Sequence, residues 1–505
     1  MHQEPLLPRA TPSTRGVAAA GVSALLDALE ARVIECHSMM VVRHGHVVAE
    51  GWWAPFSPDR PHLLYSLTKS FTSVAVGLAV HDGLLALDDR VVDVLADRVP
   101  DPVSPRAAQL TVHDLLSMST GHTDDTLEAA WTLAPDDLVR GFLRVTPEQP
   151  PGSCHAYNNP TSYVLARMVE RVTGRTLPDL LDERLFGPMG VRGAEWERLR
   201  GGGTFGFHGL YLTTEAVAAF GELLLREGRW RGRQLVPSDW VALATRRHIG
   251  TAQFEDGSRG ADWLEGYGYH FWRSRHGFRG DGAMGQFCLV LPDADAVVAV
   301  TAATARSQDL LDTVWEYLLP SLTTAGDPAR NQAGDAAGDG VGDPIRDREL
   351  AERSARLAIP MVVGDLRPDS RATGVVRTED AMSALPAGSE IAVEPRPGGW
   401  TLRIDTGGVT VEVAVGHGEW RESSPLGRPV VAAGGWQGPT FVADLFVITG
   451  PSRIRLTVDA SGAVARWNIP PLVGPQLIPQ LRSPLITRPD LSGTDAVPAS
   501  ATRVR

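Results

Sequence analysis

The sequence is short of lysine. Of its 48 basic residues, Lys69 is the single lysine and all the others are arginines. An arginine side chain keeps its proton inside a protein, whereas a buried lysine can lose it. A bias toward arginine can arise from genome composition alone, so the informative position is the one that escaped it. We expect Lys69 to serve a site that requires a neutral amine.

Other absences exclude whole classes of protein. The three cysteines, Cys36, Cys154 and Cys288, are too few and too widely spaced for a disulfide framework or a zinc site. The longest apolar stretch of the first half, 74–80, is too short to span a bilayer. A net charge of −12 argues against nucleic acid or an anionic membrane as the main partner. The N-terminal residues mix prolines and charges where a signal peptide needs an apolar core, so we expect a cytoplasmic protein.

The chain of 505 residues is too long for one ordinary core. Residues 321–345 are rich in Gly, Ala, Asp and Pro, a composition typical of a linker. We therefore predict a first domain over 1–320 that folds by itself, a second over 346–483, and a disordered polar tail over 484–505.

The first domain alternates between strand and helix patterns. Strands are predicted at 39–42 and 47–50, helices at 21–31, 66–80 and through much of 112–225, and strands again at 266–273, 285–291 and 296–302, before a closing helix at 307–319. This order predicts an α/β (α+β) domain: an antiparallel sheet covered by helices, with a separate helical lobe. After a short helix at 348–358, strands at 400–405, 409–415, 441–448, 454–458 and 464–469 predict a small barrel or sandwich.

Ser66 and Lys69 form an S-x-x-K arrangement. On a helix, residues three apart share a face, so the hydroxyl and the amine stand one above the other. Apolar neighbours disfavour the charged amine, and a neutral amine can accept the proton of a serine nucleophile. The alternative is a surface lysine that follows a serine by chance, at odds of about one in twenty.

Tyr157 and Asn159 form a second short motif, Y-x-N, inside a loop rich in Gly and Pro. A phenol near an ammonium can shift toward phenolate and shuttle protons, and the Asn159 amide can bond both the lysine and a substrate carbonyl. With 7 tyrosines and 4 asparagines in the chain, this motif is expected roughly 0.06 times by chance. A surface turn is the alternative, since Asn-Asn-Pro is ordinary turn chemistry.

These motifs occur with the segments YSLTKSFTSVAVGLAVHDG, LTVHDLLSMSTGH, YNNPTSYVLARMVERVTG and RGDGAMGQFCLVLPDADAVVAV. Over about residues 35–320 the chain thus resembles the class C β-lactamase-related family, which includes D-peptidases, carboxylesterases and amide hydrolases. The resemblance implies a β-lactamase/DD-peptidase-like fold with the site between sheet and helical lobe, and no metal or cofactor. The C-terminal region resembles, less specifically, the lipocalin-like barrel that some members append.

A third family element, normally Lys-Thr-Gly or His-x-Gly, reads Arg279-Gly280-Asp281-Gly282-Ala283 here. Glycines let the strand approach a substrate closely, and the resemblance implies that the N–H of Ala283 pairs with that of Ser66 as an oxyanion hole, with Gly282 beside it. A hairpin turn is the alternative.

Asp281 stands near the position where a penicillin binder has a cation for the substrate carboxylate. It should repel such a carboxylate unless Arg279 turns inward, and strand alternation leads us to expect Arg279 to point away. The expected result is slow or absent hydrolysis of penicillins and cephalosporins, and faster turnover of neutral or amine-bearing esters. His208 is a weaker candidate for the rim of the site, and His122 is a similar one. Nothing around Cys154 indicates an activated thiol.

The preferred reading is acyl transfer to Ser66 followed by hydrolysis, with a small ester, amide or peptide as substrate. A D-amino-acid peptidase or a peptide-cyclising acyl transferase is the nearest alternative, and a penicillin-binding sensor that never turns over is a second. The sequence does not separate the three, because pocket shape sets leaving group and acceptor. It leaves the oligomeric state unknown.

Overall fold

A six-stranded sheet lies at the centre of the first unit. The structure is a computed structural model that describes residues 4–198, 203–255, 257, 259–322 and 343–482. The sheet order is β2-β1-β11-β10-β9-β8, and all five pairings are antiparallel. The strands are β1 (Cys36–Arg43), β2 (His46–Trp52), β8 (Trp272–Ser274), β9 (Gly277–Gly282), β10 (Gln286–Leu291) and β11 (Ala296–Ala302). The predicted antiparallel sheet, built from both ends of the domain, is confirmed.

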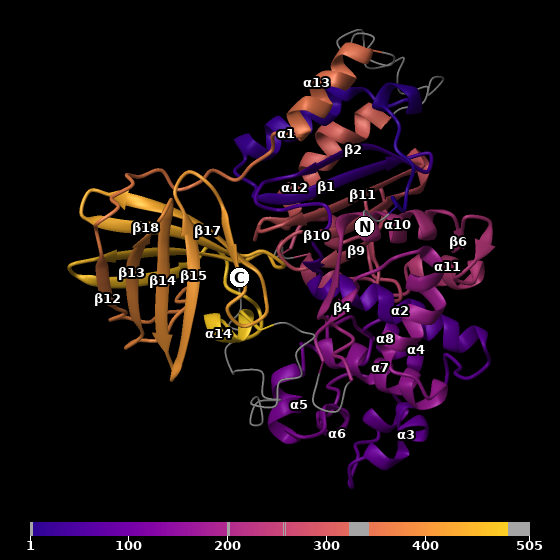
Figure 1. Cartoon of the computed structure of the whole chain (residues 1–505). Helices are drawn as coiled ribbons and strands as arrows, with labels where there is room; N and C mark the ends of the chain where they lie inside the picture. The colour runs from indigo at the N-terminus through magenta and orange to yellow at the C-terminus, as the bar shows by residue number, and fades with distance from the viewer. Residues whose placement is uncertain (1–3, 199–202, 256, 258, 323–342, 483–505) are drawn as a thin grey trace.

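Helices cover both faces of this sheet. Side chains alternate along a strand, so Met39 and Val41 of β1 pack with α1 (Ala19–Ala31) and α12 (Ser307–Thr313). Met40 and Val42 point the other way, toward α2 (Thr68–His81) and α10 (Thr214–Leu225). Figure 1 shows α1 and α12 above the sheet and the helical lobe below it. Because both faces are covered, β1 and β11 are buried along their whole length.

The helical lobe confirms the predicted insertion between the two halves of the sheet. It contains α3 (Val91–Val94), α4 (Val112–Leu116), α5 (Leu127–Leu133), α6 (Leu138–Arg144), α7 (Asn159–Thr173), α8 (Leu177–Leu181) and α9 (Gly187–Met189), and α11 (Ser238–Thr245) lies nearer the sheet. A capping box starts α4, in which the Thr111 side chain accepts from the N–H of Asp114 and the Asp114 carboxylate accepts from the N–H of Thr111. Two small sheets complete the unit: β3 (His62–Leu63), β5 (Leu210–Leu212) and β4 (Glu195–Trp196) in one, and β6 (Arg229–Trp230) with β7 (Arg233–Gln234) in the other.

Two predicted elements differ from the structure. The strand expected over 266–273 begins only at Trp272, because Gly266 and His270 have φ values of 95° and 60°, which break an extended chain. The helix expected over 307–319 ends as α12 at Thr313 and continues as a π-helical stretch, Val314–Leu318.

Nine strands form the C-terminal unit, which stands beside the first one in Figure 1. They are β12 (Ala372–Val375), β13 (Glu390–Arg396), β14 (Gly399–Thr406), β15 (Val409–Gly416), β16 (Arg421–Ser423), β17 (Val430–Gln437), β18 (Thr440–Val447), β19 (Arg453–Asp459) and β20 (Gly462–Trp467). A bridge from Val376 to Ala463 joins the two ends of the sheet, which makes it nearly a closed barrel filled by apolar side chains. The predicted all-β unit is confirmed.

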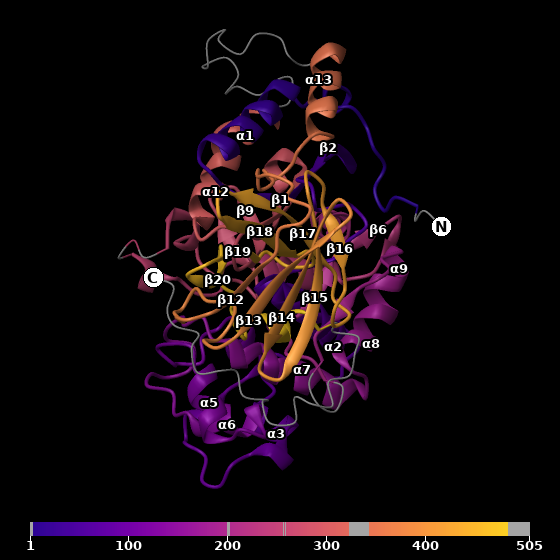
Figure 2. The same cartoon turned by 60° about the vertical axis from the view of Figure 1, so that its left-hand side comes forward.

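Strands β17 and β18 are buried on both faces. One face fills the barrel, and the other places Val431 and Phe446 in a core cluster of the first unit. There the Phe446 ring meets the Phe56 ring edge-on at a centroid distance of 5.9 Å. Arg453 of β19 also pairs with Glu35 of the first unit at 3.1 Å. Figure 2 shows the barrel from the side that faces away from the helices of the first unit.

Helix α13 (Pro344–Ser354) begins within the segment 321–345 that the sequence predicted as a linker, and it packs against α1 and β2 of the first unit. Residues 323–342 of that segment and the predicted disordered tail, 484–505, lie outside the described residues. Leu350 on this helix, and Leu357 and Ile359 after it, belong to the same core cluster as Phe56. A short helix, α14 (Leu477–Gln480), closes the described chain. No helix within the described ranges is both long and apolar enough to cross a membrane.

The independent folding of residues 1–320 stays a prediction. Because the core cluster around Phe56 includes side chains from beyond residue 320, we expect a fragment of these residues to be less stable than the full chain. A 1–320 fragment should unfold cooperatively at a lower temperature than the full chain, because the apolar surface around Phe56 loses its cover. A 1–359 fragment, which restores α13 and Ile359, should recover part of the difference. Thermal melts followed by near-UV circular dichroism measure both. Fragments without a cooperative transition would show that the two units fold as one.

Candidate active site

Ser66 lies where a single turn leads into the buried helix α2. The 3-10 turn Tyr65–Leu67 precedes α2 directly, and Tyr65 has a φ of 47°. A non-glycine residue in this left-handed region is strained and persists only where its surroundings hold it. Here the Tyr65 ring is buried against Leu63, Tyr211 and Met284. The tight turn places Ser66, which is half-buried, at the start of the helix.

The amine of Lys69 is surrounded by three oxygen atoms. Its Nζ lies 2.9 Å from Ser66 Oγ, 2.8 Å from Asn159 Oδ1 and 3.0 Å from the Phe207 carbonyl oxygen. The predicted stacking of hydroxyl and amine on one helix face is therefore present, and Asn159 joins them from α7.

Burial sets the protonation of Lys69, which is 1% exposed. Desolvation is the largest influence and lowers the pKa of Lys69 to about 7, while the carboxylates of Asp125 and Asp281 act in the opposite direction. Since the usual value is near 10.5, an appreciable share of the amine is neutral at neutral pH. The absence of other lysines pointed to this property from the sequence.

Tyr157 lies close to both Ser66 and Lys69. Its phenol is hydrogen-bonded to Ser66, and its ring stacks on Trp272 at a centroid distance of 5.9 Å. Lys69 Nζ lies 4.8 Å from the centre of the same ring. Burial, the largest influence, raises the pKa of Tyr157 despite the hydrogen bond to Ser66. The expected shift toward phenolate is thus wrong, and the phenol keeps its proton.

The Asn159 amide bonds the lysine as expected, and its other end has a partner that the sequence did not predict. Asn159 Nδ2 donates to Asp125 Oδ2 at 2.6 Å, and the Asn159 backbone N–H donates to Asp125 Oδ1 at 3.1 Å. The NH₂ group predicted to meet a substrate carbonyl is engaged with this carboxylate. Asp125 lies 34 positions earlier in the chain and is one of 60 acidic residues, so no local signal marked it.

Strand β9 passes very close to the serine turn, and two of its glycines allow this. A Cβ on Gly280 would lie 2.2 Å from Leu67 Cδ1, and one on Gly282 would lie 2.1 Å from the Leu64 carbonyl oxygen. Arg279 to Gly282 of the motif lie within β9, which pairs with β10 and β8 on its two sides, and the turn to β10 begins only at Ala283. Ala283 follows at the end of β9, and its part in an oxyanion hole stays a prediction.

The charge of Asp281 is paired. Arg279 Nε donates to Asp281 Oδ2 at 2.8 Å, and the arginine is fully buried. The expectation that Arg279 points away was wrong. Side chains alternate between the two faces of a strand, so Arg279 and Gly280 lie on opposite faces. Residues two apart share a face, and Arg279 therefore lies on the same face as Asp281. Burial still raises the pKa of Asp281, and Arg259, a residue that the sequence did not mark, acts with Arg279 and Lys69 in the opposite direction.

The two histidine candidates are both buried. His208 is 6% exposed and stacks on Phe205, and neither of its ring nitrogens has a hydrogen-bond partner among the described residues. Its Nδ1 lies 3.6 Å from Glu197 Oε2, and burial, the largest influence, lowers its pKa. A side chain this little exposed does not fit the rim position that the sequence suggested. His122 is buried as well and bonds Thr120 and the Val145 carbonyl. Cys154 contacts the carbonyl of His122 through its Sγ.

A sequence model described as "Beta-lactamase" matches residues 22–319. The chain belongs to the β-lactamase family. The match covers the whole sheet and helical lobe, and with them every residue of the site described above.

The β-lactamase-family relatives of this chain include proteins named as a hydrolase and as a peptidase. The chain is 28% identical over 293 residues to "Penicillin-binding protein 4" of Amycolatopsis lactamdurans, covering 51% of this chain and 76% of that protein. It is 26% identical over 321 residues to "6-aminohexanoate-dimer hydrolase" of Paenarthrobacter ureafaciens, covering 57% and 78%. It is 32% identical over 171 residues to "D-aminopeptidase" of Cereibacter sphaeroides, covering 31% and 32%.

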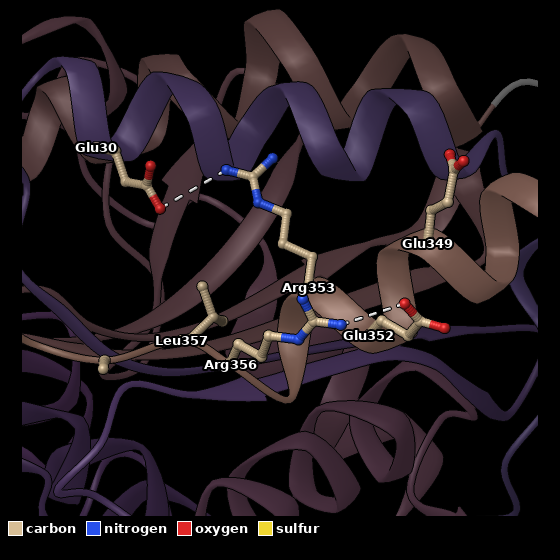
Figure 3. A pocket seen from close by; sticks show the side chains of 7 residues that line it. Glu30, Glu349, Glu352, Arg353, Arg356 and Leu357 are labelled. Atoms are coloured by element: carbon tan, nitrogen blue, oxygen red, sulfur yellow. Dashed lines mark hydrogen bonds and ion pairs between the residues drawn. The ribbon is translucent and has the colours of Figure 1, made fainter.

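Two surface depressions of this β-lactamase-family chain lie away from Ser66. One, of about 400 Å³, lies between α1 and α13 (Figure 3). Its two arginines are both paired: Arg353 with Asp27 at 2.7 Å and Glu30 at 3.6 Å, and Arg356 with Glu352 at 3.3 Å. The other, of about 320 Å³, lies on the seam between the two units and includes Arg428. Neither is lined by a residue of the Ser66 site.

Proposed function

We propose that this chain is a serine hydrolase that forms a covalent acyl-enzyme on Ser66, with small esters or amides as substrates. One observation carries the proposal: the amine of Lys69 faces two carbonyl oxygens and one hydroxyl. The oxygens of Asn159 and Phe207 accept hydrogen bonds and cannot donate them. A neutral amine has two N–H groups and one lone pair. When the N–H groups serve the two carbonyl oxygens, the lone pair is left for the Ser66 hydroxyl.

This arrangement prepares Ser66 to attack. Ser66 Oγ bonds the carbonyl carbon of the substrate while its proton passes to Lys69 Nζ, which becomes an ammonium. The carbonyl oxygen gains negative charge between the backbone N–H groups of Ser66 and Ala283. Tyr157 gives its proton to the leaving group as that bond breaks, and recovers a proton from Lys69. Water then attacks the acyl-enzyme along the reverse route and restores the Ser66 hydroxyl.

The proposed substrate class is supported by the relatives, whose names include an amide hydrolase and a peptidase. Because Arg279 pairs with Asp281, the charge argument against anionic substrates is weaker than the sequence suggested. Poor hydrolysis of penicillins and cephalosporins is still the proposal, since the nearest cation on β9 is already engaged. Rates measured on matched ester pairs, one with and one without a carboxylate, test it.

The acid limb of the pH profile tests the role of Lys69. Only the neutral amine can accept the serine proton, so kcat/KM should rise with pH through a midpoint near the pKa of about 7 and level off above it. The measurement is the pH dependence of hydrolysis of a neutral ester, beside the rate at which a fluorophosphonate probe labels Ser66. A profile that is flat between pH 5 and 9 would exclude Lys69 as the base.

Two alternatives give different kinetics. Peptidase or acyl-transfer activity appears as faster product formation when a D-amino-acid amide or an added amine is supplied. A sensor gives one burst of product, equal to the enzyme present, with no steady state after it. Sustained release of product from a simple ester favours the hydrolase.

A further inference from the structure

Asp125 holds together three parts of the site and makes no hydrogen bond to Ser66 among the described residues. Its Oδ1 accepts the backbone N–H of Asn159, the first residue of α7, and the N–H of Leu127, the first residue of α5, each at 3.1 Å. Its Oδ2 accepts Nδ2 of Asn159 at 2.6 Å. One carboxylate therefore caps two helices and fixes one side-chain amide.

We propose that Asp125 is a positioning residue: by accepting only, it keeps the amide of Asn159 turned with its oxygen toward Lys69. This inference rests on the proposed function of Ser66 and Lys69. A carboxylate cannot donate a hydrogen bond, so it accepts from the NH₂ end of the amide and leaves the oxygen end for the lysine. With that oxygen in place, the lone pair of the neutral amine is directed to the serine.

The inference predicts that Asp125→Asn, the more conservative substitution, loses more activity than Asp125→Ala. In Asp125→Asn, the single carbonyl oxygen of the new amide is held by the two backbone N–H groups. Its NH₂ group then meets Nδ2 of Asn159, donor against donor. The Asn159 amide turns over, and its NH₂ group donates to the lone pair of Lys69, which is then diverted from Ser66.

Asp125→Ala should be milder. Asp125 is exposed as a residue, so water can replace its carboxylate and accept from Asn159 Nδ2. Lys69 still needs an acceptor, so the amide keeps its orientation. A role in capping alone gives the reverse order, because asparagine keeps the acceptor for both backbone N–H groups and alanine does not.

The pH profile adds a second readout, in which Asp125→Asn is compared with Asp125→Ala. The titratable groups that face or influence Lys69 are Asp125, Asp281 on β9, Tyr157 before α7, His208 before β5 and His270 before β8. In the wild type, the carboxylates of Asp125 and Asp281 favour the ammonium form of Lys69. In Asp125→Asn, one of these carboxylates is lost and the amide of Asn159 is turned, and both changes favour the neutral amine. The carboxylate is lost in both variants, so the acid limb should move to lower pH in both. It should move further in Asp125→Asn, where the turned amide adds to the shift, and there the plateau should also fall.

The test compares Asp125→Asn, Asp125→Ala and the wild type in the full chain. Glu128→Gln is the matched control, because it removes one exposed negative charge from α5, and the Glu128 side chain makes no hydrogen bond or ion pair with the site among the described residues. The measurements are ester hydrolysis and fluorophosphonate labelling of Ser66 between pH 5 and 9, with a thermal melt of each variant. We expect kcat/KM to fall about ten- to hundredfold in Asp125→Asn, to fall less in Asp125→Ala, and to stay unchanged in Glu128→Gln.

The results separate this inference from the proposed function. If the wild type is not labelled at Ser66, the proposed function fails. If the wild type is labelled but Asp125→Ala loses more activity than Asp125→Asn, or the acid limb moves no further in Asp125→Asn than in Asp125→Ala, Asp125 only caps helices and the inference is overturned. A double variant, Asp125→Asn with Asn159→Asp, should recover part of the rate, because the new carboxylate again offers an oxygen to Lys69. Its acid limb should lie at higher pH than that of Asp125→Asn.

Discussion

Lys69→Arg is expected to reduce kcat/KM about a thousandfold or more while the protein still folds, and Ser66→Ala is expected to do the same. An arginine in this place keeps its proton at every pH in the working range, so it cannot accept the proton of Ser66. Ser66→Ala removes the nucleophile itself. Steady-state hydrolysis of a neutral ester measures both losses.

Two further variants make this result specific. Ser73→Ala changes a buried serine of the same helix whose Oγ has no hydrogen-bond partner among the described residues, so it should leave the rate unchanged. Lys69→Met fills the buried space without an amine. If the larger guanidinium of Lys69→Arg unfolds the site, the rate of Lys69→Met still tests whether the amine is required. Wild-type rates in Lys69→Arg would rule out a neutral amine as the base.

Gly282→Ala should lower kcat about a hundredfold, the scale expected when an oxyanion donor is displaced. A Cβ at this position would lie 2.1 Å from the Leu64 carbonyl oxygen and 2.9 Å from Gln286 Cβ. Backbone cannot yield as a flexible side chain does, so β9 must move away from the serine turn. The N–H of Ala283 then moves away from the place where the oxyanion forms.

Gly450→Ala is the matched substitution. Its new Cβ would meet nothing closer than the Val447 carbonyl oxygen at 3.8 Å, an ordinary contact. This variant should keep both activity and melting temperature. Near-normal kcat in a folded Gly282→Ala protein would show that β9 does not supply the oxyanion donor.

The sequence was most informative where a rare residue type stood at a fixed spacing. Lys69 is unique in the chain, and Ser66 precedes it by three positions. Helix geometry then determines their contact without any knowledge of the fold. Tyr157 and Asn159 were found in the same way, because tyrosine and asparagine are both scarce here.

The residues that the sequence missed depend on contacts between distant segments. Asp125 reaches Asn159 only because α5 and α7 begin side by side, and Trp272 supports Tyr157 only because β8 ends the sheet next to it. Strand β17 was missed since VVAAGGWQ is apolar almost throughout and lacks alternation. The structure explains that pattern: one face of the strand fills the barrel and the other meets the first unit.

The solitary amine of Lys69 also gives this protein a built-in spectroscopic reporter. Protein grown with ¹⁵N-lysine carries one labelled side-chain nitrogen, because the sequence has one lysine. That atom is buried and hydrogen-bonded to three oxygens, which slows the exchange of its protons with water. Nuclear magnetic resonance can therefore follow the charge of a single atom in a chain of 505 residues as pH changes and as Ser66 is acylated.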